Sequence, residues 1–142
     1  MQSERKDTIV DNLIRILKAI SDESRLRILN LIVNADEICV CDLESTLGFS
    51  QTKVSRHLTA LKNANLVSDR RRGLWILYSF TGDREENHKK LLKGLKDVFT
   101  SYPVFREDIH RLQQAVKNGR CKTFNVIHPN RAFKVMQLQG DV

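Results

Sequence analysis

The chain has 142 residues, a length that fits one domain with its own hydrophobic core and leaves no room for two large ones. Lys and Arg number 24 against 17 Asp and Glu, and the resulting formal charge of +7 suits a polyanionic partner such as a nucleic acid. No stretch approaches the roughly 18 consecutive apolar residues of a membrane span, and the charged N-terminus lacks the apolar run of a signal peptide. We therefore expect a cytoplasmic protein without a membrane partner, whose three cysteines are reduced thiols.

Four helices are expected in the first half of the chain. Apolar residues recur at helical spacing over residues 9–20 and again over residues 26–32. A third, short helix around residues 43–47 ends at a glycine. Ser50 is a favourable N-cap for a fourth helix, whose apolar stripe of i, i+4 and i+7 positions lies within residues 54–61.

The pattern then changes to strands and returns to helix. Residues 66–72 and 74–80 predict two strands joined by a turn at an Arg-Gly pair, where glycine tolerates a positive φ. A further amphipathic helix covers residues 91–99 and is broken by a proline. A last helix is expected from about Glu107 to Asn118. The predicted fold is therefore mainly α with a β-hairpin wing, in the α+β class, and its order is that of a winged helix-turn-helix.

The outward face of the fourth helix follows from its buried stripe. At about 100° per residue, Thr52, Arg56 and Thr59 point away from the core. No carboxylate occurs between Ser50 and Ser68, unlike an ordinary solvated helix face. Short polar and cationic side chains can reach base edges and phosphates in a major groove. The predicted DNA-binding residues of this helix are Gln51, Thr52, Lys53, Ser55, Arg56 and Thr59.

The hairpin strengthens the prediction of DNA binding. Arg70, Arg71 and Arg72 crowd its tip, where like charges repel one another unless an anion neutralises them. Because side chains alternate along a strand, the three arginines are not expected to contact DNA equally. Trp75 is interpreted as packing beneath the hairpin and His57 as a structural residue.

Three motifs, in order, resemble the ArsR/SmtB family of bacterial metalloregulators. They are Ser-Asp-Glu-Ser-Arg-Leu-Arg-Ile-Leu at 21–29, Ile-Cys-Val-Cys-Asp-Leu at 38–43 and Ser-Gln-Thr-Lys-Val-Ser-Arg-His-Leu at 50–58. The similarity covers roughly residues 9–100. It implies a homodimeric repressor of operator DNA, with its dimer interface on the apolar stripes of residues 9–20 and 91–99. The alternative for those stripes is ordinary core within one chain.

The resemblance also suggests how the chain is divided. Residues 1–102 would form the winged helix-turn-helix domain for DNA binding and dimerisation. Residues 103–142 would form a C-terminal helical extension and a tail.

Cys39 and Cys41 form the most informative short motif. Thiolates are soft ligands that favour thiophilic ions. In a regular helix these two residues lie about 200° apart and cannot hold one small ion, so joint binding requires the third helix to begin irregularly or to unwind. That helix directly precedes the DNA-reading helix, which provides a route from ligand binding to DNA release. The alternative is a pair of small buried side chains.

The motif resembles that of the family's arsenite and antimonite sensors. Glu44 occupies the place where such sensors often have a third cysteine, which makes Cys121 a candidate third ligand. The resemblance therefore implies As(III) or Sb(III) as the inducer and no obligatory cofactor. Cadmium, lead or zinc is the alternative within the family. Acidic and histidine residues around His88 and His110 are weak leads for zinc or nickel.

Three other functional classes are alternatives to a metal-responsive repressor. An enzyme is not expected, because no nucleophile with a nearby base, metalloprotease motif or phosphate-binding glycine loop occurs. A thiol redox switch would pair Cys39 or Cys41 with Cys121. A winged helix that binds only protein is disfavoured by the arginine cluster of the hairpin.

Overall fold

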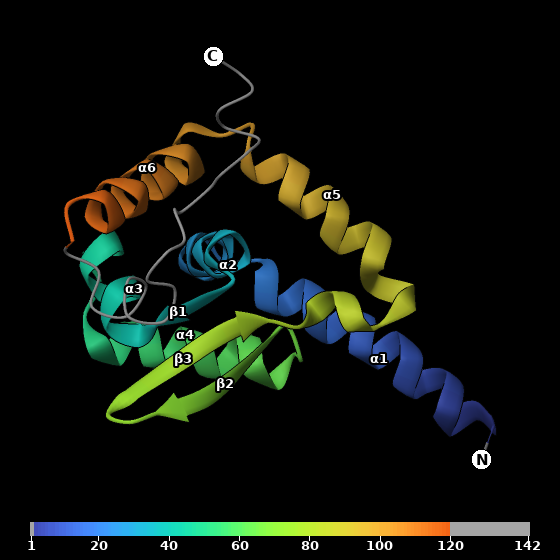
Figure 1. Cartoon of the computed structure of the whole chain (residues 1–142). Helices are drawn as coiled ribbons and strands as arrows, with labels where there is room; N and C mark the ends of the chain where they lie inside the picture. The colour runs from blue at the N-terminus through green and yellow to red at the C-terminus, as the bar shows by residue number, and fades with distance from the viewer. Residues whose placement is uncertain (1, 120–142) are drawn as a thin grey trace.

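The computed structural model describes residues 2–119, with side chains from residue 10 onward, and within them it contains six α-helices and one three-stranded antiparallel sheet (Figure 1). The elements are α1 (Gln2–Ile20), α2 (Glu23–Ala35), β1 (Glu37–Cys39), α3 (Val40–Leu47), α4 (Gln51–Asn63), β2 (Val67–Arg72), β3 (Trp75–Phe80), the single 3-10 turns η1 (Gly82–Arg84) and η2 (Glu86–His88), α5 (Lys89–Phe99) and α6 (Pro103–Lys117). The predicted class, mainly helical with a β-hairpin, is confirmed. No described helix is both long enough and apolar enough to cross a membrane.

Local side-chain chemistry sets the boundaries of the central helices. The carboxylate of Asp22 accepts a hydrogen bond from the amide of Arg25, 3.0 Å away, and caps α2. The hydroxyl of Ser50 accepts from the amide of Lys53 at 3.2 Å and caps α4, as predicted. Between the two helices of the motif, Gly48 ends α3 with a φ of 70°, a conformation that suits glycine. Gly48 and Ser50 together fix the tight connection between α3 and α4.

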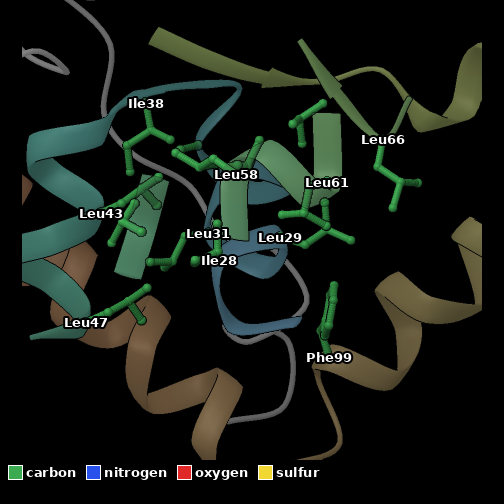
Figure 2. Packing of buried hydrophobic residues seen from close by; sticks show 14 of the residues in the cluster. Ile28, Leu29, Leu31, Ile38, Leu43, Leu47, Leu58, Leu61, Leu66 and Phe99 are labelled. Carbon is green, nitrogen blue, oxygen red and sulfur yellow. The ribbon is translucent and has the colours of Figure 1, made fainter. Parts of the chain in front are cut away.

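Helix α2 lies at the centre of the molecule. Figure 1 shows it between α6 on one side and α4 with the sheet on the other, and it contacts both α6 and α4. Its residues Ile28, Leu29 and Leu31 are at most 1% exposed. They pack among Leu58 and Leu61 of α4 in the cluster drawn in Figure 2. Burial of this face of α4 directs its other face to solvent.

The sheet contains one strand that the sequence did not predict. Its order is β1-β3-β2, so that β3 lies in the middle and the predicted hairpin forms the β2–β3 edge. The short strand β1 pairs with β3, and its last residue, Cys39, lies opposite Leu77. Gly73 makes the hairpin turn with a φ of 61°. The segment before α3 is therefore part of the sheet.

Helix α6 begins earlier than predicted. The expectation that it starts near Glu107 was wrong, because Pro103 is the first residue of the helix, where it needs no amide hydrogen and its fixed φ is favourable. Residues Phe105, Ile109 and Leu112 are buried against α2 and α3 in the common core. The division of the chain after residue 102 stays a prediction.

A buried ion pair links α6 to α2. The Asp108 side chain is fully buried and accepts hydrogen bonds from Nε and Nη2 of Arg27, at 2.8 and 2.9 Å. Arg111, one turn along α6, donates to the same carboxylate at 2.6 Å. Paired geometry of this kind satisfies both buried charges. The contact between α2 and α6 therefore combines the Arg27–Asp108 ion pair with buried apolar side chains such as Phe105.

Candidate nucleic-acid interface and cysteine site

Helix α4 presents a polar and cationic face to solvent. Its residues Val54, Leu58 and Leu61 are buried, as their spacing predicted. The predicted DNA-reading side chains on the opposite face are exposed, and they are Gln51, Thr52, Ser55, Arg56 and Thr59. Lys53 is half-buried. The structure thus gathers the predicted set on one helix, while their contact with DNA stays a prediction.

Lys53 is held beside the first turn of α4. Its ammonium nitrogen lies 3.9 Å from the centroid of the Phe49 ring, a distance typical of a cation–π contact. The guanidinium of Arg27 lies 5.2 Å from the same centroid. A lysine fixed near a helix N-terminus adds a positive charge where free backbone amides already favour anions. The sequence placed Lys53 on this face. It did not predict that the ring of Phe49 would hold the Lys53 ammonium in place.

His57 is a structural residue of α4, as predicted. His57 is 5% exposed, and its Nδ1 lies 3.3 Å from Nη1 of Arg25 on α2. Burial is the main cause that lowers the pKa of His57; the carboxylate of Asp22 opposes this shift, and neighbouring cations such as Arg25 add to it. The lowered pKa favours the neutral imidazole, which links α4 to the central helix α2 through Arg25.

The wing arginines alternate between the two faces of the sheet. Arg70 lies opposite Leu77 and Arg72 opposite Trp75, whereas Arg71, between them, lies opposite Ile76. The three side chains therefore do not point the same way, and their unequal contact with DNA stays a prediction. All three residues are exposed.

Arg70 differs from the other two arginines because it is paired. Its guanidinium donates two hydrogen bonds to the carboxylate of Glu37 on β1, one of them at 2.8 Å. Sequence reasoning missed this pair, since the two residues are 33 positions apart and β1 was not predicted. A second ion pair, from Lys62 of α4 to Asp69 of β2 at 2.9 Å, ties the wing to the helix. The wing is thus braced against both α4 and β1, and Arg70 is the wing arginine that a carboxylate already neutralises.

The two cysteines of the motif meet at the N-terminus of α3. Cys39 is the N-cap residue, with extended backbone angles (φ −75°, ψ 146°), and its sulfur lies 3.2 Å from the amide nitrogen of Cys41. The Cα atoms are 5.3 Å apart and the sulfurs form a disulfide. Because Cys39 lies outside the helix, the irregular start that the sequence required is present, and no unwinding of α3 is needed. Cys39 is buried and Cys41 is half-buried.

A cavity lies between the cysteine pair and α4. It has a volume of about 280 Å³ and lies between the N-terminus of α3, the outward side of α4 and the wing. Both cysteines line it, together with Gln51, Ser55 and Thr59 of α4. A group bound at the sulfurs would therefore lie next to side chains predicted to contact DNA.

Other candidate metal ligands are not brought together within the described residues. Asp108 is engaged by two arginines, and His88 is buried at the start of α5. Residues 10–119 contain no group of three or more His, Cys, Asp or Glu side chains that could hold a metal ion. Cys121, the predicted third ligand, lies outside the described residues.

Comparison with known proteins gives a consistent assignment. The family model described as "Bacterial regulatory protein, arsR family" matches residues 22–69. The arsenic resistance transcriptional regulator ArsR1 of Pseudomonas putida is 38% identical over 83 residues, which cover 58% of this chain and 65% of that protein. A putative arsenical resistance operon repressor of Halobacterium salinarum is 41% identical over 86 residues, covering 60% of this chain and 69% of that one. Regulators named for cadmium resistance also match, at 38% identity over 61 residues.

Solved structures share the fold. The homodimeric winged helix-turn-helix DNA-binding domain of Mb0332 from Mycobacterium bovis, a possible ArsR-family regulator, superposes with a TM-score of 0.55 at 32% identity, covering 66% of this chain and 85% of that one. The chain spans less than two thirds of the length of the first arsenic-resistance relatives. The helix-turn-helix, the wing and these similarities agree, and the chain belongs to the bacterial arsR family, whose members are DNA-binding transcriptional regulators and not enzymes.

Proposed function

We propose that this chain is a homodimeric repressor that leaves its operator when a thiophilic ion, As(III) or Sb(III), binds Cys39 and Cys41, with Cys121 as a third ligand. The observation that carries this proposal is the meeting of the two sulfurs at the start of α3, beside the cavity that borders α4. Two adjacent thiolates suit a soft ion. The arsenic-resistance names of several relatives point to the same inducer.

The DNA contacts divide into two kinds. Arg56, with the neighbouring polar side chains of α4, would read base edges in the major groove. Lys53 and the wing arginines would bind phosphates, which fix position and carry no sequence information. Arg71 and Arg72 are better placed than Arg70, since Glu37 already neutralises Arg70.

The route from ion to DNA runs through two packed elements. Cys39 is paired into the sheet through β3, and Cys41 lies in the first turn of α3, which packs on α4. An ion that bridges the two sulfurs would therefore pull on β1, which is paired with the wing strand β3, and on α3, which packs on α4. Allosteric couplings are typically about 1–3 kcal/mol, so operator affinity would fall by roughly 5- to 150-fold.

A stripe of exposed apolar residues supports the dimer. On α1, Val10, Leu13, Ile14 and Leu17 are between 38% and 51% exposed, and Val98 on α5 is 43% exposed. Their spacing on α1 is that of one helix face. A second copy that covers this face would remove apolar surface from water.

A thiol redox switch is the second candidate, and the disulfide between Cys39 and Cys41 favours it. This disulfide differs from the one considered in the sequence analysis, which paired Cys39 or Cys41 with Cys121. In this case oxidation alone would change operator affinity. Measuring operator binding by the reduced and the oxidised protein, without any metal, separates the two candidates.

The deciding experiment titrates the complex of reduced protein and operator with arsenite, antimonite, cadmium, lead and zinc. Release by arsenite or antimonite at the lowest concentrations is expected. Cys39→Ser and Cys41→Ser should each bind the operator normally and fail to release it, because serine lacks the soft donor. Loss of the response in Cys121→Ser would identify the third ligand, and a partial response would mean that another donor replaces it. If both Cys39→Ser and Cys41→Ser still leave the operator on arsenite addition, the site has been misplaced.

A further inference from the structure

A cleft lies between α3 and α6, on residues of α3 that do not line the cysteine cavity. It has a volume of about 380 Å³, and its lining residues are Ser45, Thr46, His110, Arg111, Gln114 and Ala115. Volumes of about 300–1,000 Å³ are typical of sites for small molecules. The two helices contact one another, and Figure 1 shows α6 next to α3. The cleft is therefore large enough to hold a small organic molecule between them.

Thr46 brings an unsatisfied hydroxyl to this cleft. The residue is 7% exposed, and in the described part of the chain its Oγ1 has no hydrogen-bond partner. Ser45, its neighbour in the lining, by contrast donates to the carbonyl oxygen of Asp42 at 3.3 Å. A buried hydroxyl without a partner costs free energy, which an acceptor atom of a ligand would recover. Thr46 therefore has an O–H donor available at the wall of the cleft.

Positive charge is in excess beside the cleft. Arg27 and Arg111 share the single buried carboxylate of Asp108, at 2.8 and 2.6 Å, so two positive charges face one negative charge. Glu107 comes only within 4.0 Å of Arg111 and is 66% exposed, so water screens this pair. None of the lining residues carries a carboxylate. The bond to Asp108 uses one of the five N–H donors of Arg111, which suits this guanidinium to a second anion.

We propose that this cleft binds a small organic acid, whose carboxylate accepts hydrogen bonds from Arg111 and Thr46. Its organic part would lie along Gln114 and Ala115. A carboxylate meets both requirements, because it supplies acceptor oxygens for the hydroxyl and a negative charge for the guanidinium. A water molecule would satisfy the hydroxyl alone. Because α3 packs on α4, the ligand would lie one helix away from the proposed DNA-reading face, at a site separate from the thiol pair.

The probe is para-fluorobenzoate, and its binding to the full chain is followed by fluorine NMR. We expect saturable binding with half-saturation at or below about 1 mM, as suits a small ligand with few hydrogen bonds. Para-fluorobenzamide has the same shape without the charge, and it should bind at least about fivefold more weakly because charge-assisted hydrogen bonds are the stronger ones. Acetate has the charge without the ring, so displacing half of the probe should need an acetate concentration at least about fivefold above that of unlabelled benzoate.

Two variants assign the binding to the cleft. Thr46→Val removes the hydroxyl at nearly constant volume, and Arg111→Ala removes the charge. Each should weaken binding of para-fluorobenzoate by at least about fivefold. Thr46→Val should also unfold at the same urea concentration as the wild type or at a higher one, because a methyl group replaces an unsatisfied hydroxyl. A lower midpoint would mean that the hydroxyl is satisfied in the free protein, and it would overturn the inference.

Gln113→Ala is the matched control, because this neighbour of Gln114 does not line the cleft and should leave the affinity within about twofold. Absence of saturable binding, or undiminished binding in both Thr46→Val and Arg111→Ala, would overturn the inference. So would equal binding of para-fluorobenzamide, since the charge would then contribute nothing. Displacement by acetate at the same concentration as benzoate would overturn it too, because the organic part would have no role. None of these outcomes bears on the thiol site.

Discussion

Replacing Asp108 by alanine should destabilise the protein by about 3–5 kcal/mol, because the change leaves the Arg27 guanidinium without its partner in the interior. The carboxylate is fully buried and the Arg27 side chain is only 18% exposed, so water replaces poorly the two hydrogen bonds that the variant lacks. Domains of this size are stable by about 5–15 kcal/mol, so the decrease is a large fraction of the total. The melting temperature should fall by roughly 10 °C or more.

The matched control is Arg111→Ala, which removes the third hydrogen bond to the same carboxylate. Arg111 is 51% exposed, so its pair with Asp108 should contribute no more than about 1 kcal/mol. Urea unfolding followed by circular dichroism, at one protein concentration because dimerisation would couple to stability, measures both variants. If Asp108→Ala costs no more than Arg111→Ala, the assignment of a buried pair joining α2 to α6 is refuted.

Arg56→Ala should weaken binding to the specific operator by about 1–3 kcal/mol in a gel-shift titration, and an unchanged affinity at moderate salt would discredit the assigned face of α4. Arg71→Ala should weaken binding to any DNA and reduce the slope of log K against log salt by about 0.9 for each phosphate that the variant no longer neutralises, as anisotropy at several salt concentrations would measure; an unchanged slope excludes a role for Arg71 at the phosphates. Because the pKa of His57 is lowered in the folded protein, the unfolded chain binds more protons below about pH 6.5, and stability should fall as the pH falls through that range. Urea unfolding of His57→Gln should show a smaller decrease over the same range, and an equal decrease would contradict this cause. Leu17→Glu should shift the protein towards monomer in sedimentation at micromolar concentration, whereas a monomeric wild type would exclude the dimer.

Features set by local chemistry could be predicted from the sequence. The outward face of α4 followed from Val54, Leu58 and Leu61, because a helix repeats every 3.6 residues and Ser50 marks its start. The hairpin followed from the change in periodicity and the glycine at its turn. Each of these depends on residues that are close to one another in the sequence.

Features that depend on distant partners could not be predicted. Strand β1 has three residues, too few for an alternating pattern, and it exists because β3 offers it hydrogen bonds. The pair between Glu37 and Arg70 depends on that strand. From sequence, Pro103 is expected to break a helix, yet it begins α6. Proline can end one helix or occupy the first turn of the next. The burial of Phe105 in the core determines that a helix starts here.

The position of the thiol pair is determined by strand register. Cys39 occupies the last register position of β1, opposite Leu77, and a shift of one residue would turn its side chain to the other face of the sheet. A single-residue insertion or deletion between Ala35 and Cys39 should therefore separate the two sulfurs while leaving α4 and the hairpin intact. Introducing Cys-Val-Cys into another winged helix would make a dithiol site only where a short strand precedes the helix and its register turns the first cysteine to the same face of the sheet.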